Sequence, residues 1–399
     1  MKKVFFLIGT LSTGGAERVV SNISLFLPKK NIYPVILLFS KKSKIIYNYK
    51  GEIIYLDTKD PKNVFGKLYA FIKRIIEINK IKKENPNEVM ISFLEYPNLL
   101  NLLTKNRGKL IVSVRNYMSI KHKKGFRSIL WNMSIKYLYG KADKIIAVSE
   151  EVKKDLIHHY KIDEKKIKVI YNPYPIEKII QLSNEKVENK YETIFKDPVI
   201  ITAGRLVEQK GHKYLIRTFS KVKESIDNVK LVILGEGEIE NELKKLTKHL
   251  GVENDVYFLG FQKNPFKYIS RSKVFVLSSH YEGFPNALVE AMICGIPVVS
   301  TDCLSGPREI LAPNELSESK IDYKINKERY GILCPKFECK EKNLNGSLSK
   351  EENIMADSII ALLQDNDLWN HFSKKAKERS ADFHIKNIIT EWETIINNQ

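Results

Sequence analysis

The sequence predicts an α/β protein with two domains, each built on a doubly wound parallel β-sheet covered by helices. Short apolar runs alternate with helical patterns along the chain, and this alternation is typical of parallel sheets. The chain has 399 residues, more than a single hydrophobic core usually serves. A polar stretch with prolines at 171–197 interrupts the alternation near the middle, so we expect a domain boundary there.

The first domain is expected to span residues 1–175. Its first apolar run, 3–9, follows Met1-Lys2-Lys3 and imitates a signal peptide. The run is too short for a signal-peptide core, so we interpret it as a buried strand. Further strands are predicted at 34–39, 52–56, 88–93, 110–114 and 144–148, and helices at 15–27, 65–83, 97–105, 126–139 and 150–159.

The second domain is expected to span residues 198–380, after a linker at 176–197. The segment Tyr171-Asn172-Pro173-Tyr174-Pro175 cannot continue a helix, and a polar stretch follows it. Residues 381–399 are expected to form a terminal helix that returns to the first domain. Strands are predicted at 198–203, 230–234, 255–259, 273–277 and 297–300, and a helix at 356–378.

Composition indicates a soluble protein of the cytoplasm. Hydrophobic residues make up 43% of the chain and charged residues 28%, which is the balance of a globular protein. No apolar run is long enough to span a bilayer. The four cysteines form no C-x-x-C pair, which favours a reduced setting.

The positive charge is concentrated in the first half of the chain. Residues 1–180 contain 35 Lys and Arg against 15 Asp and Glu, whereas the remainder contains 31 against 32. The asymmetry favours an anionic partner, namely nucleic acid, a membrane surface or a phosphorylated acceptor. The alternative is an AT-rich genome, which favours Lys, Ile and Asn; it would explain the number of lysines but not their uneven placement.

Residues 118–139 combine cations with an apolar, aromatic helix face. Such a pattern suits a helix that lies on anionic lipid, and it suits a core helix equally well. No nucleic-acid motif is present. We therefore expect an anionic membrane surface, and not nucleic acid, as the partner of this half.

Glycine loops follow several predicted strands, at the edge where open parallel sheets bind ligands. Gly14 and Gly15 precede a helix whose N-terminus can hold an anion, although a plain tight turn explains them as well. Arg205 and Lys210 follow Gly204 and can converge on a diphosphate, Arg as a fork and Lys as a point charge. The alternative for these two is a pair of solvated cations.

The most informative segment runs from Ser278 to Met292, after the strand at 273–277. Glu282 lies in the loop, and Glu290 lies about one and a half turns into the helix that Pro285 begins. Two carboxylates so placed can accept hydrogen bonds from two sets of hydroxyls, which suits a diphosphate with a sugar at each end. The N–H groups expected to face the interdomain cleft are those of Gly283, Phe284 and Asn286.

The E-x7-E spacing of Glu282 and Glu290, with Gly-Phe-Pro-Asn-Ala-Leu-Val between them, resembles the retaining glycosyltransferases of family 4. These group 1 enzymes have the GT-B fold, two Rossmann-like domains around a cleft. The resemblance covers nearly the whole chain. It includes the G-G-A-E loop at 14–17, the phosphate loop at 204–210, the glycine loop at 235–237, which alone indicates only a turn, and the terminal helix. Ile91-Ser92-Phe93-Leu94-Glu95 and the segment 301–309 resemble members that build bacterial lipid-linked glycans.

The resemblance implies an activity and a location. The enzyme would move a hexose or N-acetylhexosamine from a nucleotide-sugar, with UDP favoured, to a polyprenyl-diphosphate-linked saccharide. Its products would be surface polysaccharides such as lipopolysaccharide or capsule, and it would work peripherally on the inner face of the cytoplasmic membrane.

The resemblance also implies a role for each residue. Gly15, beside Gly14, would approach the donor diphosphate, which Arg205 and Lys210 would hold while stabilising the departing nucleotide. Glu290 would bind the ribose hydroxyls and Glu282 the transferred sugar. No metal or other cofactor is expected, because cations and helix termini do the electrophilic work; the D-x-D at 365–367 is interpreted as a turn. The remaining donor-binding residues would be Gly204, Gly283, Phe284, Pro285 and Asn286.

The chain departs from the family after the strand at 110–114. Many relatives carry a histidine there, whereas this chain has Arg115-Asn116, so the leaving phosphate is expected to take the acceptor's proton. Arg115, Asn116 and Glu95 are the candidates for binding the acceptor. Two other classes stay open: a UDP-sugar epimerase of the same fold, against which the E-x7-E segment and the G-G-A-E loop argue, and a non-catalytic sugar-nucleotide-binding protein.

Overall fold

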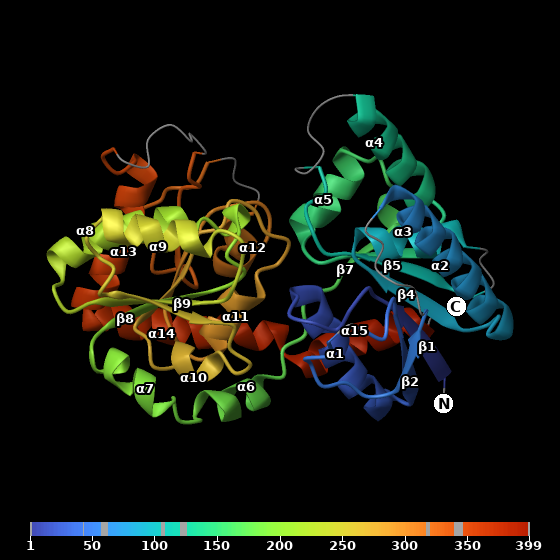
Figure 1. Ribbon diagram of the computed structural model, residues 1–399, viewed down its shortest axis with the longest axis horizontal. Helices are drawn as coiled ribbons and strands as arrows, with labels where there is room; N and C mark the ends of the chain where they lie inside the picture. The colour runs from blue at the N-terminus through green and yellow to red at the C-terminus, as the bar shows by residue number, and fades with distance from the viewer. Residues whose placement is uncertain are drawn as a thin grey trace. The chain divides into compact units, whose positions relative to one another are not determined.

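The chain folds into two compact α/β units. The computed structural model describes residues 2–42, 44–56, 63–104, 108–119, 126–316, 320–338 and 346–397, with the backbone alone at 126–131. Unit 1 consists of Met1–Tyr174 and Phe383–Gln399, and unit 2 of Pro175–Asp382 (Figure 1). Each unit carries its own parallel sheet between layers of helices, which confirms the predicted fold class.

Unit 1 contains a seven-stranded parallel sheet in the order β3-β2-β1-β4-β5-β6-β7. The order reverses between β1 and β4, and ligands of doubly wound sheets bind outside such a switch point. The strands are β1 Lys2–Leu7, β2 Ile32–Leu38, β3 Glu52–Tyr55, β4 Val89–Phe93, β5 Leu110–Val114, β6 Lys144–Ala147 and β7 Ile167–Val169. The α-helices are α1 Gly15–Phe26, α2 Val64–Glu84, α3 Glu95–Leu103, α4 Phe126–Tyr139, α5 Glu150–His158 and α15 Ile385–Asn397.

Alternate residues of β1 serve two cores, one on each face of the sheet. Val4 and Phe6 pack with α1 and α15, where Trp392 is fully buried, whereas Phe5 and Leu7 pack with α2. The chain re-enters unit 1 beside the point where it left. The Tyr174 N–H donates to the Phe383 carbonyl over 3.1 Å, and the Ile385 N–H donates to the Tyr174 carbonyl over 2.9 Å.

Unit 2 contains a six-stranded sheet in the order β10-β9-β8-β11-β12-β13, also parallel. Helices α8 and α13 contribute to the core on one face. The strands are β8 Val199–Ala203, β9 Lys230–Leu234, β10 Val256–Gly260, β11 Val274–Leu277, β12 Val298–Thr301 and β13 Ile332–Cys334. The α-helices are α6 Ile176–Ser183, α7 Asn189–Glu192, α8 His212–Ser225, α9 Glu240–His249, α10 Phe266–Ile269, α11 Asn286–Ile293, α12 Gly306–Leu311, α13 Lys350–Gln364 and α14 Asn366–Ser380.

Residues 176–197, expected as a linker, belong instead to the body of unit 2. They form α6, α7 and a 3-10 turn. The Asn264 side chain donates to the Leu182 carbonyl over 2.9 Å, and the Ser270 hydroxyl donates to the Ser183 carbonyl over 2.9 Å. The polar composition hid two short helices, of which α6 buries Ile179.

The helix expected at 356–378 is divided into α13 and α14. Asp365 lies between them, and its carboxylate accepts a hydrogen bond of 2.9 Å from the Leu368 N–H. A capping carboxylate at this place satisfies a free donor of the new helix. The acidic pair at 365–367 therefore starts a helix.

Helices α8 and α13 are joined by two ion pairs of different burial. Arg217 Nε lies 2.6 Å from Glu352 Oε1 inside the core, and Lys221 Nζ lies 2.6 Å from Asp357 Oδ1 near the surface. Arg217→Ala is expected to lower the free energy of unfolding by about 3–5 kcal/mol, because it leaves a buried carboxylate uncompensated. Lys221→Ala, the matched control, should cost less than about 1 kcal/mol. Urea unfolding measures both, and equal losses would contradict the expectation.

Candidate active site

Lys210 and Glu282 meet at the carboxyl edge of the unit 2 sheet. Lys210 follows β8 and Glu282 follows β11, which is the neighbouring strand. Lys210 Nζ lies 2.6 Å from Glu282 Oε1, and the two side chains are 19% and 8% exposed. The Ser279 hydroxyl donates to the same carboxylate oxygen over 2.6 Å. The structure thus brings together two of the three predicted catalytic side chains, and Ser279 holds one of them.

The phosphate loop after β8 is fixed to the loop after β9. The Gly204 N–H donates to the Leu234 carbonyl over 2.9 Å, and the Leu206 N–H donates to the Glu236 carbonyl over 2.9 Å. Gly235 has a φ of +138°, and a Cβ there would overlap the Gly204 carbonyl oxygen. Gly235, which the sequence indicated only as a turn, is therefore required for the close approach of the two loops.

Lys210 and Arg205 leave the phosphate loop differently. The Lys210 side chain runs past Gly204, where a Cβ would lie 3.5 Å from Lys210 Cε. Arg205 is exposed at the surface, so the structure does not join it to the Lys210–Glu282 pair.

The segment before α8 and the segment after β11 are held together by backbone and side-chain hydrogen bonds. The Ser278 hydroxyl donates to the Lys210 carbonyl, the Gln209 side chain donates to the Tyr281 carbonyl, and the His280 N–H donates to the Gln209 carbonyl, each over 2.8 Å. The sequence assigned no role to Gln209, Ser278 or His280. Their only signal was their position beside Lys210 and Glu282.

Gly211 and Gly251 offer a matched pair for testing this junction. Their φ values are +64° and +66°, but a Cβ at Gly211 would overlap the Ser278 carbonyl, whereas nothing lies within 4 Å of one at Gly251. Gly251→Ala is expected to cost about 1–2 kcal/mol of folding free energy, the cost of a left-handed backbone. Gly211→Ala should cost about 1–3 kcal/mol more, because the segments must move apart. Equal losses in urea unfolding would show that the two segments are not in tight contact.

The start of α11 is supported from the loop after β12. The Glu282 N–H donates to the Leu304 carbonyl over 2.6 Å, and the Ser305 hydroxyl donates to the Gly283 carbonyl over 2.7 Å. A Cβ on Gly306 would lie 2.6 Å from Pro285 Cδ. Gly283, Phe284 and Pro285 are buried and Asn286 is half-buried. The segment that follows Glu282 is therefore packed against the loop after β12 and hydrogen-bonded to it.

Glu290 lies apart from this contact, inside α11. It is 4% exposed. The pKa of the Cys294 thiol is raised to about 12, mainly by the burial of that thiol and in addition by the nearby charge of Glu290. Glu282 and Glu290 therefore occupy two distinct environments of unit 2.

In unit 1, the predicted anion site at the start of α1 is occupied by a carboxylate of the chain itself. Gly14 is the N-cap of α1, and Gly15 is its first residue. A Cβ on Gly14 would overlap the Glu17 carboxylate, which also accepts a hydrogen bond of 3.2 Å from the Thr10 hydroxyl. The helix N-terminus attracts this negative charge. A bound phosphate would have to displace it.

The three predicted acceptor residues follow neighbouring strands of unit 1. Glu95 starts α3, directly after Leu94, whose φ of +75° is unusual for a bulky residue. Arg115 is 8% exposed and donates from Nη2 to Asn172, while its Nη1 has no hydrogen-bond partner among the described residues. Burial lowers the pKa of Arg115 to about 10, so it remains charged at neutral pH. Asn116 beside it is half-buried.

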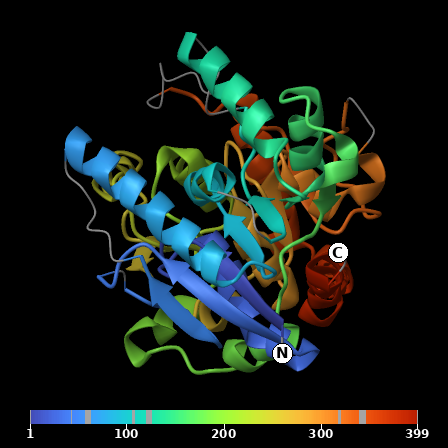
Figure 2. The same cartoon turned by 90° about the vertical axis from the view of Figure 1, so that its right-hand side faces the viewer.

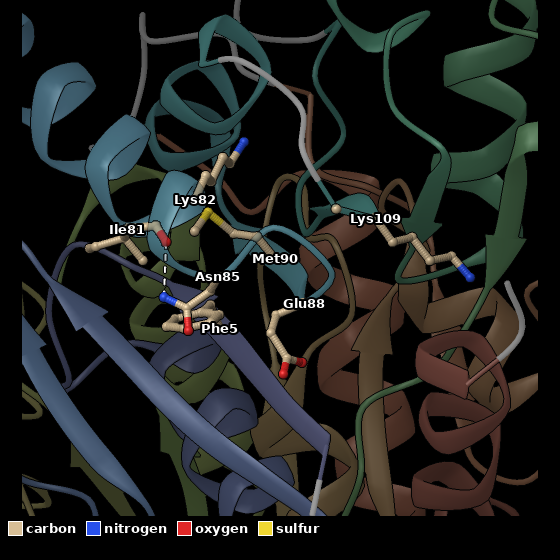
Figure 3. Close-up of a pocket in the computed structure, with 8 residues that line it drawn as sticks. Phe5, Ile81, Lys82, Asn85, Glu88, Met90 and Lys109 are labelled. Carbon is tan, nitrogen blue, oxygen red and sulfur yellow. Dashed lines mark hydrogen bonds between the residues drawn. The ribbon is translucent and has the colours of Figure 1, made fainter.

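A small hollow lies at the opposite, amino-terminal edge of the unit 1 sheet (Figure 3). Phe5, Lys82, Met90 and Lys109 are among its lining residues, and its water-accessible volume is about 10 Å³. That is the room of about one water molecule. The Lys82 ammonium donates to the Asn101 carbonyl and the Thr104 hydroxyl over 3.1 and 2.7 Å. The hollow is too small for a sugar or a nucleotide.

The chain is similar to known proteins over most of its length. Residues 13–178 match the family described as Glycosyltransferase Family 4, and residues 183–327 match the family described as Glycosyl transferases group 1. An uncharacterized glycosyltransferase of Methanocaldococcus jannaschii is 41% identical over 92% of this chain and 95% of its own length.

Two further similarities concern proteins with named ligands. A Campylobacter jejuni enzyme, the N-acetylgalactosamine-N,N'-diacetylbacillosaminyl-diphospho-undecaprenol 4-alpha-N-acetylgalactosaminyltransferase, is 31% identical over 96% of both chains. Anabaena Alr3699/HepE, whose crystal structure is a complex with UDP and glucose, superposes with a TM-score of 0.73 at 18% identity over 99% of both chains. At this low identity, the similarity to Alr3699/HepE shows that the two proteins share a fold.

Proposed function

The chain belongs to the glycosyltransferases of group 1 and family 4. From this membership we propose that it transfers a hexose or N-acetylhexosamine from a nucleotide-sugar to a polyprenyl-diphosphate-linked saccharide. The transfer retains the configuration of the anomeric carbon. The Lys210–Glu282 contact carries the proposal. It puts a cation beside a carboxylate that can accept hydrogen bonds from sugar hydroxyls, at the edge of the sheet where ligands bind. UDP is the favoured nucleotide, since a protein of the same fold is known with UDP and glucose bound.

The acceptor class is proposed from the relative with a named substrate. The Campylobacter enzyme acts, by its name, on a saccharide attached to diphospho-undecaprenol, and the basic first half of this chain suits a phosphorylated acceptor at an anionic surface. We place the enzyme in surface-glycan synthesis, on the inner face of the cytoplasmic membrane.

In the proposed reaction Lys210 and Arg205 neutralise the donor diphosphate and stabilise the departing nucleotide. Glu282 accepts hydrogen bonds from the transferred sugar, held in position by Ser279 and by the Ser305 support. Glu290 accepts hydrogen bonds from the ribose. These protein cations supply the electrophilic assistance, so no metal is assigned to the reaction.

The acceptor's proton is assigned to the donor. The acceptor hydroxyl oxygen bonds to the anomeric carbon while the carbon–oxygen bond to the phosphate breaks on the same face, and the proton passes to that phosphate oxygen. Two histidines lie near Lys210, but burial lowers the pKa of His212 to about 3 and also lowers that of His280. Both are therefore neutral at pH 7. We assign the acceptor's phosphate or sugar to Arg115, whose buried Nη1 has no hydrogen-bond partner among the described residues, together with Asn116 and, after the neighbouring strand, Glu95.

A donor and acceptor panel tests the proposed function. The protein is incubated in EDTA with UDP- and GDP-sugars and polyprenyl-diphosphate-linked saccharides, and NMR identifies the anomer of the product. We expect transfer from a UDP-sugar with the donor's anomeric configuration kept. Inversion would refute retention, and an epimer formed without acceptor would favour an epimerase. Donor binding without transfer to any acceptor would favour a non-catalytic binding protein.

A further inference from the structure

Helix α2 of unit 1 exposes a continuous apolar face. Six of its large hydrophobic side chains are between 49% and 85% exposed. Single exposed apolar residues are normal on a protein surface, but a contiguous group of this size indicates a binding surface. The six residues, called here the α2 face, are Val64, Phe65, Leu68, Tyr69, Ile72 and Ile76.

The α2 face covers one side of the helix and takes no part in the core. At about 100° per residue its members fall within about 140° of the helix circumference. The adjoining side of α2 packs on β1 and β2 through Phe71, Ile75 and Ile78, and Arg74 is buried over the Phe39 ring at 4.1 Å. Figures 1 and 2 show α2 running along the outside of unit 1. The helix is therefore anchored without its exposed face.

The charge around the α2 face selects the partner. Helix α2 carries five lysines and one arginine against two glutamates, and the first 180 residues carry the whole positive excess of the chain. At helical spacing Lys73 and Lys80 border the apolar arc, and Lys83 lies beyond its C-terminal end. A second copy would bring the same positive charge to the contact and be repelled. An anionic phospholipid surface satisfies both the apolar side chains and the lysines.

The length of α2 fits a helix that lies on a bilayer. It has 21 residues, and none of the helices within the described part of the chain combines the length and the apolar character needed to cross a membrane. Aromatic residues such as Phe65 and Tyr69 suit the depth of the lipid headgroups.

We propose that the α2 face docks unit 1 on an anionic phospholipid bilayer, with its apolar side chains among the upper acyl chains and its lysines at the headgroup phosphates. This docking surface rests on the proposed function in one respect: docking would bring the enzyme to its lipid-linked acceptor. The surface expected from the sequence, 118–139, is a different one, and its cations at 121–124 lie outside the described residues. In the part that is described, Met133 and Tyr137 of α4 are exposed.

Co-sedimentation of the full chain with vesicles tests the proposal. The wild type should bind phosphatidylcholine–phosphatidylglycerol vesicles, weakly in about 0.5 M NaCl, and should bind pure phosphatidylcholine poorly. The variant F65S/L68S/I72S should lose at least about tenfold in partition. The control I180S/I325S replaces two exposed side chains of unit 2 and should bind like the wild type. M133S/Y137S should retain most of the binding; if it alone abolishes binding, the α2 face is not the docking surface.

Two further measurements separate the possible failures. Sedimentation velocity without lipid should give the same mass for the wild type and the F65S/L68S/I72S variant; a smaller mass for the variant would show that the α2 face joins two copies and would overturn the proposal. Transfer to a water-soluble acceptor should be equal in both proteins. If neither transfers sugar but the vesicle result holds, the docking surface stands and the proposed function falls. Unchanged vesicle binding by the variant would overturn the docking surface alone.

Discussion

Lys210→Ala is expected to reduce kcat for sugar transfer by about 10²–10³-fold, the usual cost of removing one group that stabilises charge in a transition state. Lys210 Nζ contacts the carboxylate assigned to the sugar, and the loop that carries it is fixed to its neighbours by backbone hydrogen bonds. The substitution therefore removes a cation without releasing the loop. Circular dichroism and thermal unfolding should show a folded protein.

Lys213 is the matched control for Lys210. Its side chain is also 19% exposed, but it pairs with Glu208 and Glu242 on the outer side of the same segment. Lys213→Ala should keep kcat within about twofold of the wild type, because partly exposed ion pairs contribute little. A Lys210→Ala enzyme with near-normal turnover, or equal losses in the two variants, would remove Lys210 from the reaction.

Glu290→Gln is expected to raise the KM for the nucleotide-sugar by about 10²-fold, because hydrogen bonds to a charged acceptor are worth about 1.5–3 kcal/mol each. Glu290 is almost fully buried in α11, and glutamine keeps its shape, so stability should change little. Initial rates across donor concentrations measure KM, and calorimetry with UDP measures binding directly.

Nucleotides that lack one ribose hydroxyl test whether Glu290 acts through the ribose. Wild-type protein should bind 2'-deoxy-UDP and 3'-deoxy-UDP more weakly than UDP, and Glu290→Gln should discriminate much less, since the interacting pair is already broken on the protein side. If the variant still distinguishes the nucleotides as the wild type does, the ribose is bound elsewhere. The assignment of Glu290 would then be wrong, while that of Lys210 would be unaffected.

The sequence predicted most of the fold because buried parallel strands are continuous apolar runs. The strands of three residues, β7 and β13, escaped prediction because so short a run has no periodicity. The 176–197 segment was misjudged because polar residues dominate it, although Ile179 anchors a helix. These errors concern short elements, whose position depends on tertiary contacts.

The candidate site was predictable in position but not in its contacts. Lys210 and Glu282 could each be placed at a strand end, yet they are 72 residues apart, and only the strand order shows that they meet. The role of Ser279 depends on the direction of its side chain, which no motif records. The Glu17 carboxylate above Gly14 was likewise invisible, because it depends on how the first turn of α1 closes.

The return of α15 to unit 1 has a consequence for how the protein is made. A ribosome must synthesise residues 175–382, which takes about 10–40 s at 5–20 residues per second, before it reaches the helix that carries Trp392. During this interval the face of β1 and β4 that α15 later covers remains open in the nascent chain. Unit 2 is contiguous and can complete its core first. Unit 1, although its first strands are synthesised first, therefore completes its core only after the whole of unit 2 has been made, and until then its uncovered apolar face is open to aggregation.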